Sequence, residues 1–155
     1  MVTGEHTEIA FAVHKAINKA LERMGLDEAI HHYQDVDIDV NGQRKQADIG
    51  WGPRRPPRGC PKRPTAVLEV TVSETQRKLH RDIDLWLDPV RENANFAIAI
   101  KVNRQRPMIS IDKWVWDHLN GTSLSSQHIE VSESETDRVK LSGGPVVIPF
   151  HLFFL

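Results

Sequence analysis

The sequence has almost no cysteine and no long run of apolar residues. Cys60 is its single cysteine, so neither an internal disulfide nor a thiolate zinc site can form, and a reducing compartment is expected. No stretch approaches the ~20 apolar residues of a membrane span, and the first residues lack the basic and apolar regions of a signal peptide. We therefore expect a soluble, intracellular protein of the cytoplasm or nucleus, with no membrane partner.

An excess of charge of either sign is also missing. The chain has 20 Lys and Arg against 21 Asp and Glu, which excludes a uniformly basic nucleic-acid-binding protein. One proline-rich segment, residues 53–64, is nevertheless basic and contains no acidic residue; its cations are Arg54, Arg55, Arg58, Lys62 and Arg63. Arginines bind phosphate in a bidentate manner and prolines keep the backbone extended, so this loop is a candidate for contacting nucleic acid. A solvated, flexible loop is the alternative.

The periodicity of the apolar residues predicts one domain, residues 1–155, of mixed α and β structure. An amphipathic helix is expected at residues 5–24, ended by Gly25. Alternating residues at 33–40, followed by Asn41-Gly42, predict a hairpin whose second strand runs over residues 44–51.

Two buried strands are predicted further along, at residues 65–72 and 96–102. Capping-box patterns that start at Thr71 and Ser73 predict a helix between these strands, which ends before Pro89. A strand, a helix and a strand in this order favour a parallel pair with a right-handed crossover.

The last third of the chain is expected to add C-terminal strands to this αβββαβ core. Residues 108–116 favour a strand, whereas the Ser-rich residues 123–134 favour a loop with a short strand. The closing run VVIPFHLFFL is apolar and must be buried. It is expected either to form a further edge strand on the domain's own core or to form a homodimer interface.

Three residues of the predicted sheet form the candidate site. Asp48 lies near the end of the second hairpin strand, and Glu69 and Thr71 point to one face of the next strand because they are two residues apart. A lone carboxylate in a strand as apolar as AVLEVTV costs several kcal/mol unless a metal, a cation or hydrogen bonds compensate it. Glu69 therefore needs a partner.

These residues resemble the motif of the PD-(D/E)XK, or restriction-endonuclease-like, nuclease superfamily. Its pattern is an Asp at the end of the second core strand and Glu-x-Lys on the third, similar here to Asp48 and to Glu69-Val70-Thr71. More narrowly, the segment AVLEVTVSETQRKLHRDIDLWL, the following FAIAIKVN, the later IDKW and the closing IPF resemble a group of small fungal members.

The resemblance implies a restriction-endonuclease-like fold and metal-dependent hydrolysis of phosphodiester bonds. Asp48 and Glu69 would hold Mg²⁺ or Mn²⁺ together with substrate phosphate, since Mg²⁺ takes oxygen ligands and is commonly bound by one or two carboxylates. An acid at the start of the first helix, Glu5 or Glu8, is a further candidate ligand. Nucleic acid is the implied partner, with DNA favoured over RNA. Trp51, next to Asp48, is a candidate for stacking on a base.

The sequence departs from the motif at Thr71, which stands where the family has its lysine. A hydroxyl can orient a water molecule but cannot neutralise the negative charge that develops on phosphate. Some members of the superfamily are similar in carrying the lysine on the following helix, where Lys78 is the first candidate and Arg77 the second. A catalytically inactive nucleic-acid-binding or oligomerisation module of the same fold is the alternative function.

Each site residue also has a structural interpretation that the sequence leaves open. Asp48 can be a polar residue at a strand end, and Glu69 can be a structural carboxylate paired with Lys78 or Arg81. His80 and Asp84, four residues apart, are expected to form a surface pair rather than part of a catalytic triad.

Overall fold

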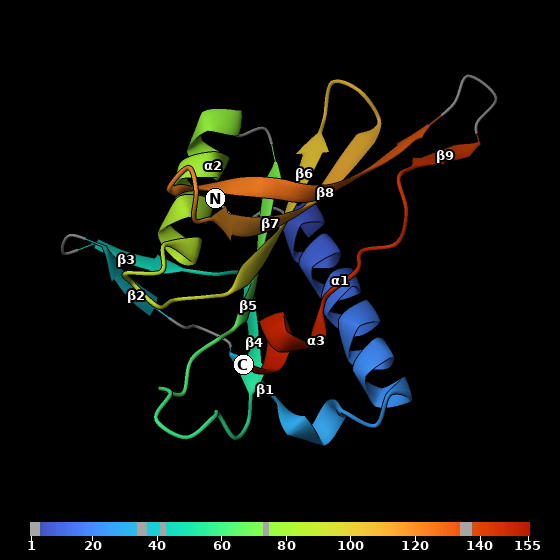
Figure 1. Ribbon diagram of the computed structural model, residues 1–155. Helices are drawn as coiled ribbons and strands as arrows, with labels where there is room; N and C mark the ends of the chain where they lie inside the picture. The colour runs from blue at the N-terminus through green and yellow to red at the C-terminus, as the bar shows by residue number, and fades with distance from the viewer. Residues whose placement is uncertain (1–3, 34–36, 41–42, 73–74, 134–137) are drawn as a thin grey trace.

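The computed structural model describes residues 4–33, 37–40, 43–72, 75–133 and 138–155. Within these ranges a seven-stranded mixed sheet has the strand order β1-β4-β5-β6-β7-β8-β9. Figure 1 shows it running through the middle of the molecule, with α1 and α2 on opposite sides. Its strands are β1 (Ile30–Tyr33), β4 (Ile49–Pro53), β5 (Ala66–Val72), β6 (Phe96–Asn103), β7 (Met108–Asp117), β8 (Thr122–Glu133) and β9 (Val139–Ser142).

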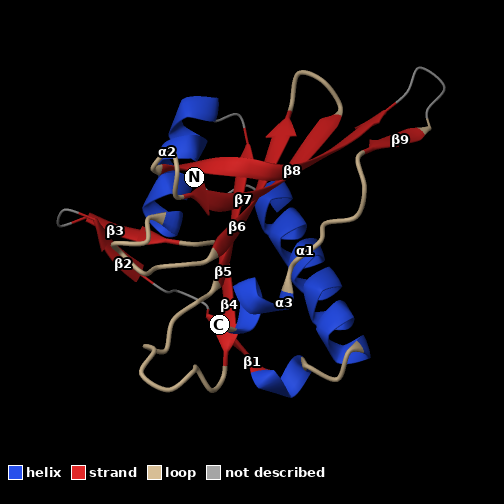
Figure 2. Cartoon of the chain, in the orientation of Figure 1, coloured by secondary structure: helices blue, strands red, loops and turns tan. Residues whose placement is uncertain are grey.

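The other elements are three α-helices, a short 3₁₀-helix and a second, two-stranded sheet (Figure 2). The helices are α1 (Gly4–Arg23), α2 (Gln76–Leu87), α3 (Phe150–Phe154) and the 3₁₀-helix η1 (Asp27–Ala29), and the second sheet pairs β2 (Asp37–Val40) with β3 (Gln43–Gln46). Among the described residues, no helix combines the length and the apolar character required to cross a lipid bilayer.

The first helix forms where the sequence predicts it and ends as predicted. Gly25 adopts a φ of 67°, its N–H donates to the Glu22 carbonyl, and the N–H of Leu26 donates to the Leu21 carbonyl, both at 2.9 Å. This pair of bonds is a Schellman cap, which satisfies carbonyl groups that the helix end would leave open.

The parallel pair at the centre of the sheet is confirmed. β5 pairs in parallel with β6, from Ala66 opposite Phe96 to Val72 opposite Val102, and α2 connects the two strands. Alternation along β5 divides its side chains between two cores: Leu68 packs beneath α1 and α3, whereas Val67 packs beneath α2. Glu69 and Thr71 have the same parity as Val67, so they lie on the α2 side.

The predicted hairpin is only partly right. β2 and β3 pair around the predicted turn, with Val40 opposite Gln43, although Asn41 and Gly42 themselves lie outside the described residues. The continuous strand predicted at 44–51 is wrong, because it is divided between β3 and β4. Of the strand predicted at 33–40, residues 34–36 lie outside the described residues, and Tyr33 and residues 37–40 belong to different sheets. β1 ends at Tyr33 and pairs with β4, which begins at Ile49. The β2–β3 pair is therefore an insertion in the sequence between two strands that are neighbours in the main sheet.

Two further predictions are corrected near the C-terminus. Residues 123–134, predicted as a loop with a short strand, contribute most of β8, which pairs with β7 from Asp117–Thr122 to Met108–Ser132. The serines do not prevent this because pairing with β7 outweighs their weak strand propensity. The strand predicted at 108–116 is confirmed as β7. β9, which the sequence did not indicate, lies beyond β8 at the sheet edge.

The closing apolar run forms a helix rather than the predicted strand. Pro149 precedes α3 as its N-cap residue, and it cannot donate to a strand ladder. Phe153 is 5% exposed and its ring centroid lies 5.8 Å from that of Phe96, so this segment is buried on the chain's own core. Homodimer formation through its exposed residues remains a prediction.

We expect Phe153→Ala to lower the free energy of unfolding by about 3 kcal/mol, because it leaves a cavity in the core beneath β5 and β6. Phe150→Ala on the same helix is the matched control, since its side chain is 62% exposed, and it should cost less than about 1 kcal/mol. Urea unfolding followed by circular dichroism measures both. Equal decreases in the free energy of unfolding for the two variants would contradict the burial of Phe153 in the core.

Candidate active site

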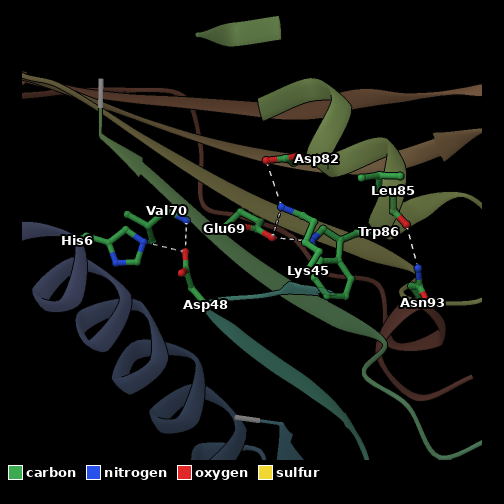
Figure 3. Close-up of polar contacts among 9 residues, drawn as sticks. All are labelled: His6, Lys45, Asp48, Glu69, Val70, Asp82, Leu85, Trp86 and Asn93. Carbon is green, nitrogen blue, oxygen red and sulfur yellow. Dashed lines mark hydrogen bonds and ion pairs between the residues drawn. The ribbon is translucent and has the colours of Figure 1, made fainter. Parts of the chain in front are cut away.

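The candidate site lies where β4 and β5 meet beneath α2 (Figure 3). Ile49 pairs with Leu68 in the antiparallel β4–β5 ladder, and the N–H of Asp48 donates to the Leu68 carbonyl at 3.1 Å. The pairing therefore brings Asp48 next to Glu69, as the sequence predicts. The predicted position of Asp48 near the end of a strand is corrected, because this residue lies in the break between β3 and β4.

Asp48 is fixed by the neighbouring strand and by the first helix. Its Oδ2 atom accepts a hydrogen bond of 2.6 Å from the Val70 N–H and lies 3.1 Å from Nε2 of His6. Burial raises the pKa of Asp48, whereas the Val70 N–H and His6 act in the opposite direction. The carboxylate is thus held in one orientation although its ionised form is poorly solvated.

Glu69 is the most strongly perturbed acid of the site. Its Oε1 atom accepts a hydrogen bond of 2.5 Å from Trp86 Nε1 and lies 3.5 Å from Lys45 Nζ. The pKa of Glu69 is raised to about 7, chiefly by burial and also by the charges of Asp48 and Asp82, whereas Lys45 and the Trp86 N–H act in the opposite direction. The site therefore supplies less positive charge than its carboxylates need to stay ionised.

α2 contributes a polar pair on the face that it packs against the sheet. Asp82 and Trp86 are four residues apart and so lie on the same side of the helix, which also carries the buried Leu79 and Ile83. Asp82 Oδ2 lies 3.1 Å from Lys45 Nζ. Trp86 is fully buried and donates its N–H to Glu69.

Thr71 is 5% exposed, and its Oγ1 atom has no hydrogen-bond partner among the described residues. An unpaired buried hydroxyl is uncommon, because leaving it unsatisfied costs about 1–3 kcal/mol. Its predicted role in orienting a water molecule remains a prediction.

Lys78 lies in the first turn of α2. The predicted caps are corrected: Thr75 is the N-cap residue and accepts from the Lys78 N–H at 3.3 Å, whereas Ser73 and Glu74 lie outside the described residues. Lys78 is exposed and lines a groove of about 520 Å³ together with Thr75, Arg77, His80, Arg81 and Asp84. Its role as the displaced catalytic lysine remains a prediction. The ammonium group next to Glu69 belongs to Lys45.

Three residues of the site, His6, Lys45 and Asp82, were missed by the sequence analysis. Glu5 and Glu8 were its candidates on the first helix, but Glu5 pairs with Arg104 at 3.0 Å on the surface. His6 precedes Ile9, Ala10 and Val13 by three, four and seven residues, a spacing that could have placed it on the inner face. Lys45 gave no such signal, because the break between β3 and β4 was not recognised.

The basic loop lies at the other end of β4. Arg54 follows Pro53, and the five residues of β4 span about 17 Å at ~3.3 Å per residue, so the loop and Asp48 flank opposite ends of this strand. Arg54, Arg55, Arg58 and Lys62 are exposed. Arg63 instead donates to Asn95 Oδ1 at 2.9 Å, which ties the end of the loop to the residues before β6.

Trp51 does not offer a stacking surface, which corrects the suggestion that it contacts substrate. It is fully buried and its ring stacks on His14 with centroids 5.8 Å apart. His80 and Asp84 pair at 3.8 Å as predicted. Asp84 accepts from Ser123 Oγ at 2.6 Å, and Ser123 is 2% exposed, so this cluster ties α2 to β8.

The carboxylate oxygens of Asp48 and Glu69 could provide some of the ligands of a hard divalent cation. Among the described residues, no group of three or more His, Cys, Asp or Glu side chains is close enough to hold a metal ion. Asp48 and Glu69 offer carboxylate oxygens, which Mg²⁺ prefers, and Mg²⁺ completes its shell with water and substrate phosphate.

No protein-family model and no curated protein matches this chain. Among solved structures, the chain resembles the crystal structure of a proposed nuclease belonging to DUF820 from Anabaena variabilis. The superposition has a TM-score of 0.51 and 13% identity, and it covers 96% of this chain and 74% of the other. This chain has a restriction-endonuclease-like fold. At this identity the likeness shows the fold, and the resemblance to small fungal members remains an expectation.

Glu69→Gln should change the pH dependence of stability. With a pKa of about 7 against an ordinary 4.5, the folded chain keeps a proton that the unfolded chain releases, so stability falls as pH rises between these values. A neutral glutamine removes this loss. In buffer free of divalent cations, the free energy of unfolding of the variant should exceed that of the parent by up to about 3 kcal/mol near pH ~8. Near pH ~4.5 the two values should differ little.

Urea unfolding at the two pH values measures this difference. Glu22→Gln, a change at an exposed position of α1, is the control and should follow the parent at both. If the Glu69→Gln variant were less stable than the parent near pH ~8, the ionised Glu69 carboxylate would not destabilise the folded chain, which would contradict its raised pKa.

Proposed function

We propose that this chain is a metal-dependent nuclease that hydrolyses phosphodiester bonds at the site of Asp48 and Glu69. The observation that carries the proposal is a pair of largely buried carboxylates with raised pKa values, Glu69 on β5 and Asp48 in the break before β4. Burying two acids side by side destabilises the fold unless a cation compensates them.

The residues around the two acids have separate tasks in this proposal. The Val70 N–H fixes Asp48 Oδ2 and the Trp86 N–H fixes Glu69 Oε1, so a second oxygen of each carboxylate remains to bind Mg²⁺ or Mn²⁺. A metal bound there would polarise a phosphoryl oxygen and lower the pKa of a coordinated water. The Thr71 hydroxyl, on the same face as Glu69, would orient that water.

Nucleic acid is the proposed substrate, with DNA favoured over RNA, and the cytoplasm or nucleus is where the chain would meet it. Arg54, Arg55, Arg58 and Lys62 extend from the far end of β4 and would contact backbone phosphates away from the cleaved bond. Such contacts position a strand without reading its sequence.

The second candidate is a catalytically inactive nucleic-acid-binding or oligomerisation module of the same fold. The observation that favours it is Thr71, which stands where the resembled motif carries a lysine.

Asp48→Asn and Glu69→Gln should each reduce metal-dependent cleavage by at least about 100-fold, because each removes a charged ligand worth several kcal/mol of transition-state stabilisation. Cleavage of labelled DNA and RNA with Mg²⁺, with Mn²⁺ and with a chelator measures this effect. Glu22→Gln should cleave like the parent. A parent chain that binds nucleic acid but cleaves neither DNA nor RNA with either metal would favour the inactive module.

Changing Arg54, Arg55, Arg58 and Lys62 together to Gln should flatten the salt dependence of nucleic-acid binding. Each phosphate contact contributes about −0.9 to the slope of log affinity against log salt, so the magnitude of the slope should fall by up to about 3.6. Arg63 is kept because its bond to Asn95 is part of the fold. An unchanged slope, measured by fluorescence anisotropy, would show that these four cations are merely solvated.

A further inference from the structure

We propose that Lys45, from the inserted β2–β3 pair, supplies the cation that the catalytic strand lacks at Thr71. The inference rests on the proposed nuclease function and adds to it a residue that comes from outside the motif. Its basis is the position of the Lys45 ammonium group, 3.5 Å from Glu69 Oε1 and 3.1 Å from Asp82 Oδ2.

The side chain of Lys45 is directed into the site by the geometry of β3. Neighbouring residues of a strand point to opposite sides, and Arg44 shows the outward direction: its side chain is 82% exposed and pairs with Asp37 at 3.4 Å. The Lys45 side chain is 20% exposed. Figure 3 shows it extending between Asp82 and Glu69, with the indole of Trp86 beside it.

Two carboxylates hold the ammonium group in place. A surface lysine normally samples many rotamers, and holding it in one costs side-chain entropy of up to about 2 kcal/mol. Here Glu69 and Asp82 approach from different elements, β5 and α2, so the group is fixed from two directions. Asp82 is therefore a positioning residue, because it acts on substrate only through Lys45.

The same short stretch of chain delivers both a cation and a metal ligand. Lys45 and Asp48 are three residues apart, and Ala47 between them is 8% exposed and packs in the core beneath α2. This anchoring of Ala47 fixes where the two flanking side chains enter the site. Thr71 is buried on the same face of β5 as Glu69. A lysine at residue 71 would therefore place its charge near Glu69, and Lys45 of β3 provides that charge instead.

The ammonium group has the hydrogen-bonding capacity that the reaction requires. It carries three N–H donors, of which Glu69 and Asp82 take two. The third can donate to a non-bridging phosphate oxygen, where negative charge increases as water attacks phosphorus and the leaving oxygen departs. A donor aimed at such charge in a site shielded from water is worth about 10²–10³-fold in rate.

The test compares Lys45→Met, which keeps the side-chain length without the charge, with Lys45→Met/Thr71→Lys, which returns the lysine to the position that it has in the resembled motif. Steady-state cleavage kinetics and Mn²⁺ binding by calorimetry are measured for each. Arg44→Met, the outward-facing neighbour on β3, is the matched control, and Lys78→Met tests the rival lysine of α2.

We expect Lys45→Met to reduce kcat by about 10²–10³-fold with little change in KM, and the double variant to recover at least about 10-fold. Mn²⁺ affinity should be kept or increased in Lys45→Met, since a positive charge near the carboxylates is removed. Arg44→Met and Lys78→Met should cleave within about 3-fold of the parent. Rescue at residue 71 is a result that a merely structural role for Lys45 would not produce.

The possible failures can be told apart. An active parent with an equally active Lys45→Met would overturn the assignment and leave the nuclease proposal standing. Loss of turnover in Lys78→Met but not in Lys45→Met would transfer the role to α2. A Lys45→Met variant that loses Mn²⁺ binding, or that is not rescued at residue 71, would make Lys45 a structural residue. An inactive parent would overturn the proposed function and this assignment together.

Discussion

The burial of Glu69 in the middle of β5 is the constraint on which the arrangement of this molecule depends. A carboxylate inside an apolar strand must be compensated, and its neighbours come from three separate parts of the chain: β3 provides Lys45, the break before β4 provides Asp48, and α2 provides Asp82 and Trp86. The inner faces of α2 and of the inserted pair are polar where they meet this residue. Packing and chemistry are therefore determined together at this point.

The parts of the fold that were predictable are those with a strong local pattern. The four-residue apolar repeat of α1, its terminating Gly25, and the apolar runs of β5 and β6 each bury one definite face, so periodicity was enough to place them. The parallel pairing followed from the order of strand, helix and strand along the chain. β8 was missed because its serines are accommodated by pairing with β7 and by the bond between Ser123 and Asp84, which depend on tertiary contacts.

The residues of the candidate site likewise fall into those that a local pattern reveals and those that depend on tertiary contacts. Asp48 and Glu69 were found because a motif and a strand parity bring them together. His6, Lys45 and Asp82 were missed because their roles depend on how α1, β3 and α2 are set against the sheet. Lys45 and Arg44 are adjacent basic residues that the sequence does not distinguish, and only the boundaries of β3 decide that one points inward and the other to solvent.

Because β2 and β3 form a separate sheet, Lys45 can move away from the site while the carboxylates stay in place. Two strands alone are only marginally stable in water, so this pair depends on the contacts that join it to the rest of the chain, among them those of Lys45 with Glu69 and Asp82. The carboxylates, by contrast, are held by the central ladder, whose opening requires most of the free energy of global unfolding. A local opening that released only the inserted pair would leave the acids in position and would change the net charge of the pocket by one unit.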